Sequence, residues 1–333
     1  MRLPHFEYEK ASSLEQCLDI LEQYGEEVMI LAGGTDLLVN MKYGTVRPNR
    51  ILSIKSIADL QSIDEDGEGN VKIGAGATLS DIARNPIVSE KLPALHEAVR
   101  SIASKHIRNM ACIGGNICLP PRCWYFNQSR LWREALGPCH RTQGTVCHAM
   151  PGAKRCHAVN YSDTAPVLMA LNAQVHVMNK KRERVMPLRE FYRDNGAAHT
   201  VLAPDEILTS VLVPQSALSR RTVFIKVSDR KGLDFATGNI SVSIKNKGQQ
   251  ITEVAIVVNS VTSAPVRLNK AADHLMTFGF EGTSVSGAGK IARSELGPVT
   301  NLFTSAGTKR RIVEVLVKRA VDCLKANERK AGN

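Results

Sequence analysis

The sequence lacks any apolar run long enough to cross a membrane. Nowhere in its 333 residues does a stretch approach the ~20 consecutive apolar residues that a membrane helix requires. The first ten residues, MRLPHFEYEK, also lack the apolar core of a secretory signal. These features argue against a membrane protein and a secreted disulfide scaffold, and we expect a cytoplasmic protein in which clustered cysteines more often bind metal.

Several catalytic signatures are also missing. No G-x-G-x-x-G opens a helix, and there is no G-x-x-x-x-G-K-[ST], H-E-x-x-H or G-x-S-x-G. A nicotinamide site of the dinucleotide-fold type therefore has no support. Phosphoryl transfer, zinc proteolysis and serine hydrolysis lack their residues as well.

Among the features that the sequence does have, the first is a net charge of +11 with histidine neutral. The densest basic runs are Lys180–Arg184 and Lys309–Arg311, and neither is interleaved with aromatic residues. Nucleic-acid binding requires a basic stripe or a recognisable module, and neither is present. We expect a solvated basic face, with attraction to an acidic protein or an anionic cofactor as the alternative.

The hydrophobic pattern predicts an α+β fold. Strands mix with helices without a regular βαβ period, and from about residue 221 the pattern changes to three antiparallel strands followed by helices. The predicted helices are 13–24, 78–83, 92–104, 164–171, 266–277 and 309–325, and the predicted strands are 28–32, 50–54, 71–77, 174–178, 222–227, 240–245 and 251–258.

Cysteines are concentrated in one segment. Cys123, Cys139, Cys147 and Cys156 follow C-x15-C-x7-C-x8-C within a proline- and glycine-containing stretch that has no sustained period. Four thiolates can hold one cubane iron–sulfur cluster or a tetrahedral zinc ion. Spacing does not choose between them, because the short C-x(2–4)-C pair usual in zinc sites is missing. An iron–sulfur cluster, zinc and unligated packing cysteines all remain open at this point.

Two glycine pairs follow apolar residues. The first, in Leu31–Leu38 (LAGGTDLL), joins a short strand to a helix start, and the second is Ile113–Asn116 (IGGN). Glycines let a backbone approach a ligand closely, and amides at such a turn attract phosphate. Asp36 does not suit this interpretation, because a carboxylate repels pyrophosphate. We expect Asp36 to cap the turn or to form a hydrogen bond within the loop, while backbone amides bind the phosphate. Cys112 and Cys118 flank the second turn and are interpreted as packing residues.

These turns, together with Ser162–Pro166 (SDTAP), resemble the FAD-binding subunit of the molybdenum hydroxylases, the group of xanthine dehydrogenase and CO dehydrogenase. The resemblance covers nearly the whole chain. In most members the Gly-Gly-Asn turn and the later Asp lie close together, whereas here the cysteine-rich segment separates Asn116 from Asp163 as an insertion. Within it, Arg122-Cys123, Trp132-Arg133 and Lys154–Cys156 look like the β subunits of 4-hydroxybenzoyl-CoA reductases, whose inserted loop holds an extra [4Fe–4S] cluster.

The resemblance implies a two-lobed FAD-binding fold of the vanillyl-alcohol oxidase type and a C-terminal domain with a three-stranded antiparallel sheet and helices. The implied boundaries are 1–220 for the FAD-binding domain, with lobes of about 1–57 and 58–220 and an insertion at 117–160, and 221–333 for the C-terminal domain. The implied FAD-binding residues are Leu31, Ala32, Gly33, Gly34, Thr35, Asp36, Leu37, Leu38, Ile102, Cys112, Ile113, Gly114, Gly115, Asn116, Asp163, Leu208 and Lys226, and the implied cluster ligands are Cys123, Cys139, Cys147 and Cys156.

For function, the resemblance implies an electron-transfer subunit without catalytic residues of its own. A molybdopterin-binding large subunit and a [2Fe–2S] small subunit would be its partners in a dimer of heterotrimers, with ferredoxin as electron donor for the reductive dehydroxylation of an aromatic CoA thioester. Two alternatives are the flavin and iron–sulfur subunit of an aldehyde oxidoreductase and, from another class, a zinc-stabilised binding or scaffold protein. Taken alone, Asp163 would equally serve as a helix N-cap, and Lys226 as an exposed strand lysine.

Overall fold

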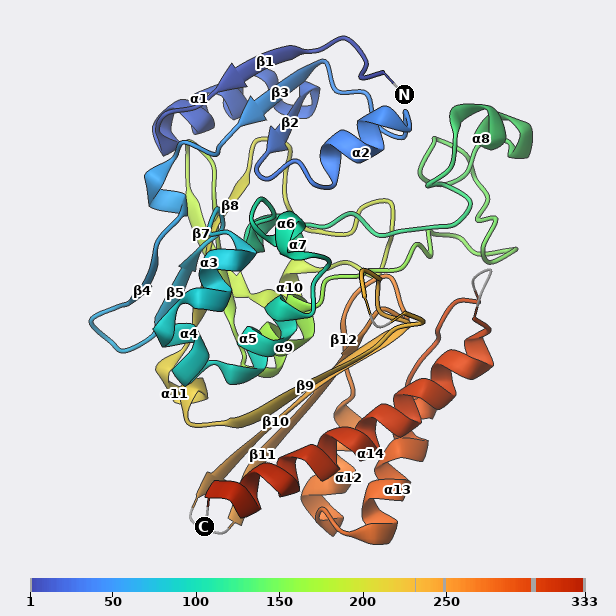
Figure 1. The fold of residues 1–333 in the computed structure, drawn as a ribbon. Coiled ribbons are helices and arrows are strands. Elements are labelled where there is room, and N and C mark those ends of the chain that lie inside the picture. The colour runs from blue at the N-terminus through green and yellow to red at the C-terminus, as the bar shows by residue number, and fades with distance from the viewer. Residues whose placement is uncertain (1, 231, 248–249, 301–303, 332–333) are drawn as a thin grey trace.

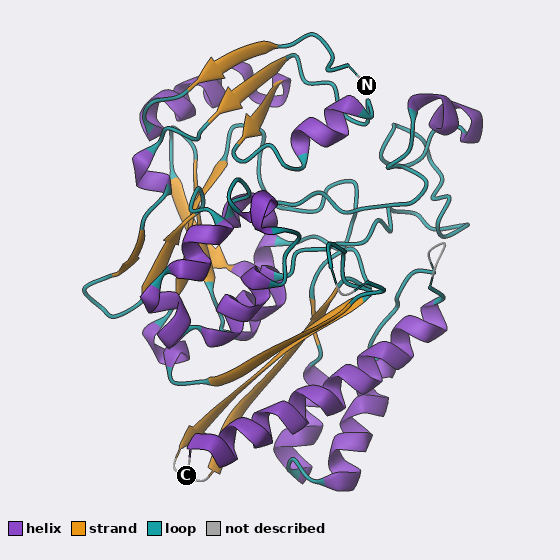
Figure 2. Ribbon diagram, in the orientation of Figure 1, coloured by secondary structure: helices purple, strands orange, loops and turns teal. Residues whose placement is uncertain are grey.

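The structure is a computed structural model that describes residues 2–230, 232–247, 250–300 and 304–331 (Figure 1). Its backbone forms three separate sheets, with helices against each, and the cysteine-rich insertion projects from the side of the molecule (Figures 1 and 2). No helix in the described ranges combines the length and the apolar character needed to cross a membrane.

The N-terminal lobe contains a parallel sheet in the order β1-β3-β2, made of Glu7–Lys10, Arg50–Ser53 and Val28–Leu31. Helix α1 (Leu14–Tyr24) covers this sheet, burying Leu18 and Leu21 in a small core, and the Ser13 side chain accepts a hydrogen bond from the amide of Gln16 at its start. A 3₁₀ turn η1 (Gly25–Glu27) leads into β2, and the short helix α2 (Leu37–Lys42) follows it. The predicted strand–turn–helix is therefore confirmed.

The second lobe is a five-stranded antiparallel sheet in the order β4-β5-β8-β6-β7. The largest hydrophobic core joins its strands to the helices packed beside them. The strands are β4 (Ile63–Glu65), β5 (Val71–Gly74), β6 (Gln174–Met178), β7 (Glu183–Pro187) and β8 (Ile207–Val213); the helices are η2 (Ala58–Leu60), α3 (Leu79–Arg84), α4 (Pro86–Lys91), α5 (Pro93–Arg100), α6 (Lys105–Arg108), α7 (Ile113–Ile117), α9 (Thr164–Ala170), α10 (Leu188–Phe191) and α11 (Gln215–Leu218).

The C-terminal unit has an antiparallel sheet in the order β12-β11-β10-β9, with helices on one face (Figure 2). Its strands are β9 (Arg221–Val227), β10 (Gly238–Lys247), β11 (Gln250–Asn259) and β12 (Val266–Arg267), and its helices are α12 (Asn269–Phe278), α13 (Gly282–Ser294) and α14 (Ala306–Ala331). Ile240, Val242 and Ile244 alternate along β10 into the core under these helices. Helices α5 and α9 of the second lobe pack against the sheet as well.

Three predicted elements differ from the structure, and several observed elements, α13 among them, were not predicted. The C-terminal sheet has a fourth strand, β12, because Val266–Arg267 pair with β11 and do not begin the following helix. The strand predicted at 71–77 ends at Gly74. The helix predicted at 92–104 ends at Arg100, and Ala103 shortly afterwards has a φ of 45°, which is incompatible with a right-handed helix. Helix α13 was not predicted, because its sequence is rich in glycine and serine; its small residues Ala288, Gly289 and Ala292 are buried between α12 and α14.

The insertion is mostly loop. Its base is closed by an antiparallel bridge in which the backbones of Arg122 and Val159 exchange two hydrogen bonds of 2.8 Å. It also contains one short helix, α8 (Arg130–Leu136), where the hydroxyl of Ser129 accepts a hydrogen bond from the amide of Trp132. Figure 1 shows α8 standing apart from the body of the molecule.

Candidate functional site

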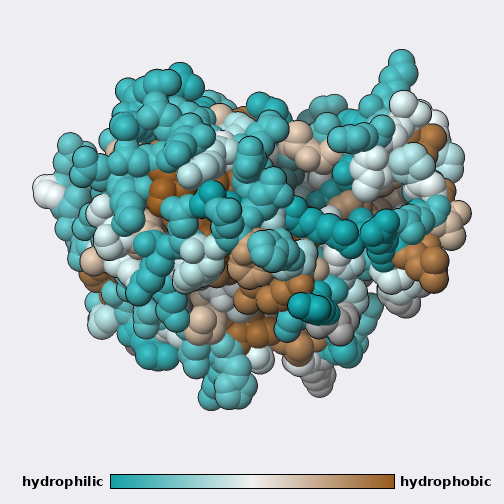
Figure 3. Space-filling model, turned by 90° about the horizontal axis from the view of Figure 1, so that it is seen from above, coloured by the Kyte–Doolittle hydropathy of each residue, from teal (hydrophilic) through white to brown (hydrophobic). Residues whose placement is uncertain are grey.

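A cavity of about 790 Å³ is lined by the two glycine turns, the start of the insertion, strand β9 and the loop after it. Its volume falls within the ~300–1,000 Å³ that small-molecule and cofactor sites occupy. Its wall contains Ala32–Leu37, Ile102, Cys112, Gly115, Asn116, Asp163 and Lys226, so turns far apart in sequence meet here. Seen from above, the surface of the molecule is largely hydrophilic, with apolar side chains gathered in a few patches (Figure 3).

The first glycine turn is held close to the second by backbone packing. A Cβ atom on Gly33 would lie 1.9 Å from the carbonyl oxygen of Met110, so only glycine allows the two segments to touch. Gly34 has a φ of 70°, the left-handed region that favours glycine. Among the described residues, the amide N–H groups of Gly34 and Thr35 have no protein acceptor. The turn can therefore donate hydrogen bonds to a phosphate in the cavity.

The second turn forms the start of α7. The thiol of Cys112 accepts a hydrogen bond from the amide of Gly115 at 3.3 Å, so it caps the helix. Burial raises the pKa of Cys112, and it raises that of Cys118 to about 12, so both are neutral thiols at physiological pH. The interpretation of Cys112 as a mere packing residue was thus incomplete. The side chain of Asn116 accepts hydrogen bonds from Ser162 (2.8 Å) and Thr164 (2.7 Å), which ties this turn to α9.

Asp163 and Lys226 form a buried ion pair in the cavity wall. Lys226 Nζ lies 2.7 Å from the carboxylate of Asp163 and also donates to the carbonyl of Ser101 at 3.1 Å. Asn239 donates a further hydrogen bond of 2.6 Å to the same carboxylate. Burial raises the pKa of Asp163, and Lys226 and Asn239 oppose that increase. Asp163 does occupy the N-cap position of α9, but its side chain makes no cap hydrogen bond and pairs with Lys226 instead. Lys226 is buried in this pair, so its interpretation as an exposed strand lysine was wrong.

Two arginines of the insertion lie in the same wall, which sequence reasoning missed. Arg122 pairs with Asp36 and donates to Asn40 at 3.0 Å. Arg141 donates to the carbonyl of Pro121 at 2.7 Å and lies 4.0 Å above the ring of Phe126. Burial lowers the pKa of Arg122 to about 10 and lowers that of Arg141, yet Arg122 remains a cation at neutral pH.

The chemistry of this wall fits FAD. Unpaired amides and buried cations suit a pyrophosphate, while the carboxylate of Asp163 supplies oxygen acceptors for hydroxyl groups. Tyr161 and Phe235, whose ring centres lie 4.8 Å apart, add an aromatic surface. Five of the implied FAD-binding residues, namely Leu31, Leu38, Ile113, Gly114 and Leu208, lie outside the cavity wall, with Leu208 in the hydrophobic core.

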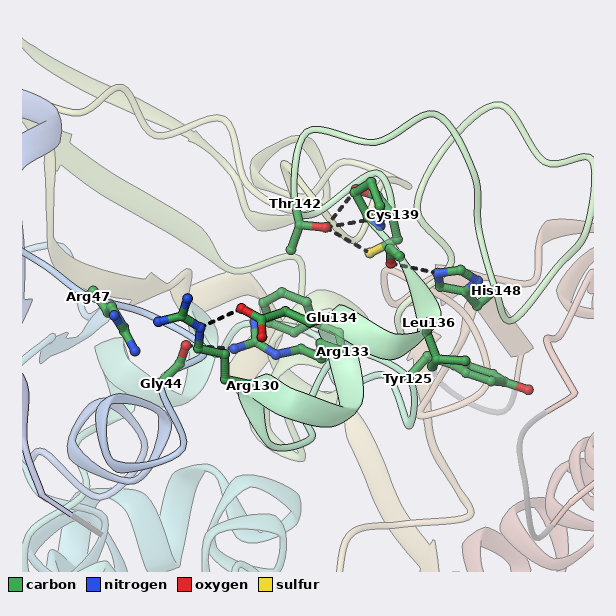
Figure 4. Close-up of a pocket in the computed structure, with 13 residues that line it drawn as sticks. Gly44, Arg47, Tyr125, Arg130, Arg133, Glu134, Leu136, Cys139, Thr142 and His148 are labelled. Carbon is green, nitrogen blue, oxygen red and sulfur yellow. Dashed lines mark hydrogen bonds and ion pairs between the residues drawn. The ribbon is translucent and has the colours of Figure 1, made fainter.

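The cysteine-rich segment presents a second cavity, of about 540 Å³, between α8 and the loop after α2. Cys139 lies on its wall, where the hydroxyl of Thr142 is 3.8 Å from the thiol (Figure 4). Arg130, Arg133 and Arg47 line it too, and Arg133 donates to the carbonyl of Gly44 at 2.7 Å, which fixes α8 to the N-terminal lobe.

The predicted cluster ligands are brought together only in part. Burial raises the pKa of Cys156 to about 11, and the nearby thiols of Cys123 and Cys147 contribute to that increase. Arg141 faces Cys123, Cys139 and Cys156. Within the described part of the chain, however, no three histidine, cysteine or acidic side chains lie close enough to hold a metal ion. As arranged here, the four thiols do not form a cluster site.

Comparison with known proteins agrees with the fold and the cavity. Residues 4–216 match the FAD binding domain in molybdopterin dehydrogenase, and residues 223–324 match the CO dehydrogenase flavoprotein C-terminal domain. The chain is 26% identical to the carbon monoxide dehydrogenase medium chain of Hydrogenophaga pseudoflava over 96% of each chain. It is 27% identical to the glyceraldehyde dehydrogenase medium chain of Sulfolobus acidocaldarius, over 95% of this chain and 97% of that one.

Two further relatives bear on the function. The aldehyde oxidoreductase FAD-binding subunit PaoB of Escherichia coli is 28% identical over 72% of this chain and 77% of its own length. The solved structure of the Hydrogenophaga pseudoflava enzyme lacking the Mo-pyranopterin moiety superposes with a TM-score of 0.80 at 25% identity, covering 98% of this chain and 99% of that one.

Together, the fold and the matches define an FAD-binding oxidoreductase subunit. The chain belongs to the FAD-binding subunits of the molybdenum hydroxylase family, whose members include CO dehydrogenase medium chains and xanthine dehydrogenase FAD-binding subunits.

Proposed function

We propose that this chain binds FAD in the 790 Å³ cavity and transfers electrons within a molybdenum-containing oxidoreductase. The observation that carries this proposal is the meeting of both glycine turns with the Asp163–Lys226 pair in one wall. Bound FAD would supply a centre that exchanges electrons in pairs or singly. The chain's own part would be to bind and orient it: the unpaired amides of Gly34 and Thr35 would donate to the pyrophosphate, and Asp163 would accept hydrogen bonds from hydroxyl groups.

The division into an FAD-binding domain, 1–220, and a C-terminal domain, 221–333, belongs to this proposal. Support comes from β9, which begins at Arg221 and opens the separate C-terminal sheet. Lys226 and Asn239 of that sheet both contact Asp163, so the C-terminal domain completes the cavity wall.

The partners we propose are a molybdopterin-binding large subunit and a [2Fe–2S] small subunit, assembled as a dimer of heterotrimers in the cytoplasm. The names of the relatives support this, because several are medium chains or FAD-binding subunits of larger enzymes. A net charge of +11 would suit an acidic electron donor such as ferredoxin.

For the reaction, we propose the 4-hydroxybenzoyl-CoA reductase type, reductive dehydroxylation of an aromatic CoA thioester on the large subunit. Its support is the insertion, with the resemblances around Cys123, Trp132 and Cys156. Aldehyde oxidation is the second candidate, favoured by the names of the glyceraldehyde dehydrogenase and aldehyde oxidoreductase relatives. Assays of the intact complex with aromatic CoA thioesters and with aldehydes distinguish the two, and activity with neither contradicts both.

We also propose that the insertion closes around a [4Fe–4S] cluster. Its support is four thiols in one loop, three of them beside Arg141. Closure would require these thiols to move together from the arrangement described above. Anaerobically purified protein should then contain about four iron and four sulfide per chain. Cys139→Ser should lose most of both, while the matched control Cys17→Ser, a buried thiol in the N-terminal lobe, should keep them.

The same measurement tests the alternative class. Stoichiometric zinc without iron, in a chain whose absorption spectrum has no flavin bands, would support a zinc-stabilised scaffold and overturn the electron-transfer proposal. Flavin bands without any metal would support the proposal of FAD binding and contradict the proposal of an iron–sulfur cluster.

A further inference from the structure

Arg122 is one of the insertion residues in the wall of the flavin cavity, and neither the sequence nor the comparisons assign a role to it. Its guanidinium pairs with the carboxylate of Asp36 through Nη2 and donates to Asn40 Oδ1 through Nη1 at 3.0 Å. Both partners belong to the first glycine turn and the helix after it, whereas Arg122 lies at the base of the insertion. The contact therefore joins the inserted segment to the phosphate-binding turn.

The position of Arg122 is fixed from several sides. Its backbone exchanges two hydrogen bonds of 2.8 Å with Val159, which closes the base of the insertion. Asn40, which accepts from Arg122, is held by its own hydrogen bond to Asp36, with Nδ2 2.9 Å from the carboxylate. About four fifths of the Arg122 side chain is buried, since 20% of it is exposed, and that of Asp36 is 24% exposed. The pair is thus ordered and largely shielded from solvent, where charges interact more strongly than at the surface.

Asp36 creates an electrostatic problem for this cavity. Its carboxylate lies in the turn whose free amides at Gly34 and Thr35 would meet a pyrophosphate, and a negative charge there repels that group. Arg122 is the cation paired with it, and Arg141 adds a second guanidinium to the same wall. Without Arg122, the turn would present an unneutralised carboxylate to a dianionic ligand.

We propose that Arg122 is an FAD-affinity determinant, an insertion residue that neutralises Asp36 and makes the inserted segment part of the flavin site. The inference rests on FAD occupying the cavity, as proposed above. It predicts that removal of the Arg122 guanidinium weakens flavin binding even though the glycine turns stay intact. It further predicts that the loss depends on the charge of Asp36, because Arg122 acts through that carboxylate.

The test is a double-mutant cycle on the affinity of the FAD-free chain for FAD, measured by quenching of flavin fluorescence at low ionic strength. Arg122→Met should raise the dissociation constant by about tenfold or more. Adding Asp36→Asn to Arg122→Met should recover most of that loss. Arg122→Lys, which keeps the charge, should bind FAD more tightly than Arg122→Met. Arg155→Gln is the matched control. Arg155 belongs to the insertion, pairs with Asp194 at 2.5 Å and is not part of the cavity wall, so the affinity for FAD should not change.

The possible results distinguish a failure of this inference from a failure of the proposed function. If the wild-type chain binds no FAD, the proposed function fails. If the wild type binds FAD and Arg122→Met binds it equally well, Arg122 plays no part and the inference is wrong. If Arg122→Met loses affinity, but Asp36→Asn restores none and Arg122→Lys is no better, Arg122 acts only as a structural anchor, which also contradicts it. Circular dichroism of each variant shows whether it is folded, and Arg122→Lys keeps the test decisive where Arg122→Met does not fold.

Discussion

At the scale of single residues, the sequence predicted the backbone features of the site better than its ion pairs. The glycines of the two turns could be recognised, because close backbone approach leaves a local pattern. Asp163 and Lys226 were placed in the site only through the family resemblance. Their ion pair joins the start of α9 to β9, and no regular spacing in the sequence marks two residues that meet in this way. Arg122 was missed for the same reason: nothing in the sequence around it indicates that its partner is Asp36.

A first prediction concerns Gly33. Gly33→Ala would place a methyl group against the carbonyl oxygen of Met110, so the two turns must separate. We expect a loss of about 1–3 kcal/mol in the free energy of unfolding, together with loss of FAD binding. Urea unfolding and flavin fluorescence measure both. Gly67→Ala is the control, because a Cβ there meets nothing within 4 Å. Unchanged FAD affinity in Gly33→Ala would show that close contact between the turns is unnecessary.

A second prediction concerns the buried ion pair. Lys226→Met leaves the carboxylate of Asp163, in a side chain only 6% exposed, without its cation. Removing one partner of a buried pair typically costs about 3–5 kcal/mol, and we expect a loss of that order in urea unfolding of the FAD-free chain. The double variant Asp163→Asn/Lys226→Met should regain most of it. Equal destabilisation in the single and double variants would mean that the charge of Asp163 is not the cause.

At the scale of elements, prediction succeeded where hydrophobic periodicity was strong and failed where tertiary packing decides. Strands β6, β9, β10 and β11 and helices α1 and α9 agree with the predicted ranges to within a few residues. Helix α13, which is rich in small residues, forms because those residues allow close packing against α12 and α14, a reason that local sequence does not reveal. The insertion has no hydrophobic periodicity, so no helix was predicted in it. Helix α8 within it depends on the Ser129 cap and on the hydrogen bond from Arg133 to the carbonyl of Gly44.

Helix α14 gives a third prediction. Lys309, 1% exposed, donates to the carbonyl of Val299 at 2.8 Å, and burial lowers its pKa from 10.5 to about 8. Below pH 8 the lysine is charged in both the folded and unfolded chain, so stability carries the full cost of burying the charge. That cost is released as pH rises from about 8 to 10.5, because the folded chain loses its proton first.

The wild type should therefore gain stability over this pH range relative to Lys309→Met, by up to about 3 kcal/mol. Thermal unfolding followed at several pH values measures the difference. Lys318→Met, an exposed lysine on the same helix, serves as the control and should parallel the wild type. Parallel pH curves for the wild type and Lys309→Met would contradict the account of this buried lysine.

At the scale of the whole molecule, the hydrophobic pattern predicted the α+β class and the C-terminal sheet, and the family resemblance predicted the two-lobed FAD-binding fold, which the structure and the comparisons confirm. The four cysteines were predicted as one ligand set, yet the described arrangement does not bring three of them together around a metal. Thiol spacing in a long loop constrains neither the path of the loop nor the separation of its sulfur atoms, so composition alone could not decide this point.

The central claim is that the cavity between the two glycine turns binds FAD. The most direct test is the FAD stoichiometry of the wild-type chain beside Gly34→Val. Its branched side chain would be strained at a φ of 70° and would press on Leu31 and Leu38, so the turn whose amides would bind the pyrophosphate must distort. The account predicts one FAD per chain in the wild type and none in folded Gly34→Val. Normal flavin content in a folded Gly34→Val chain would contradict it.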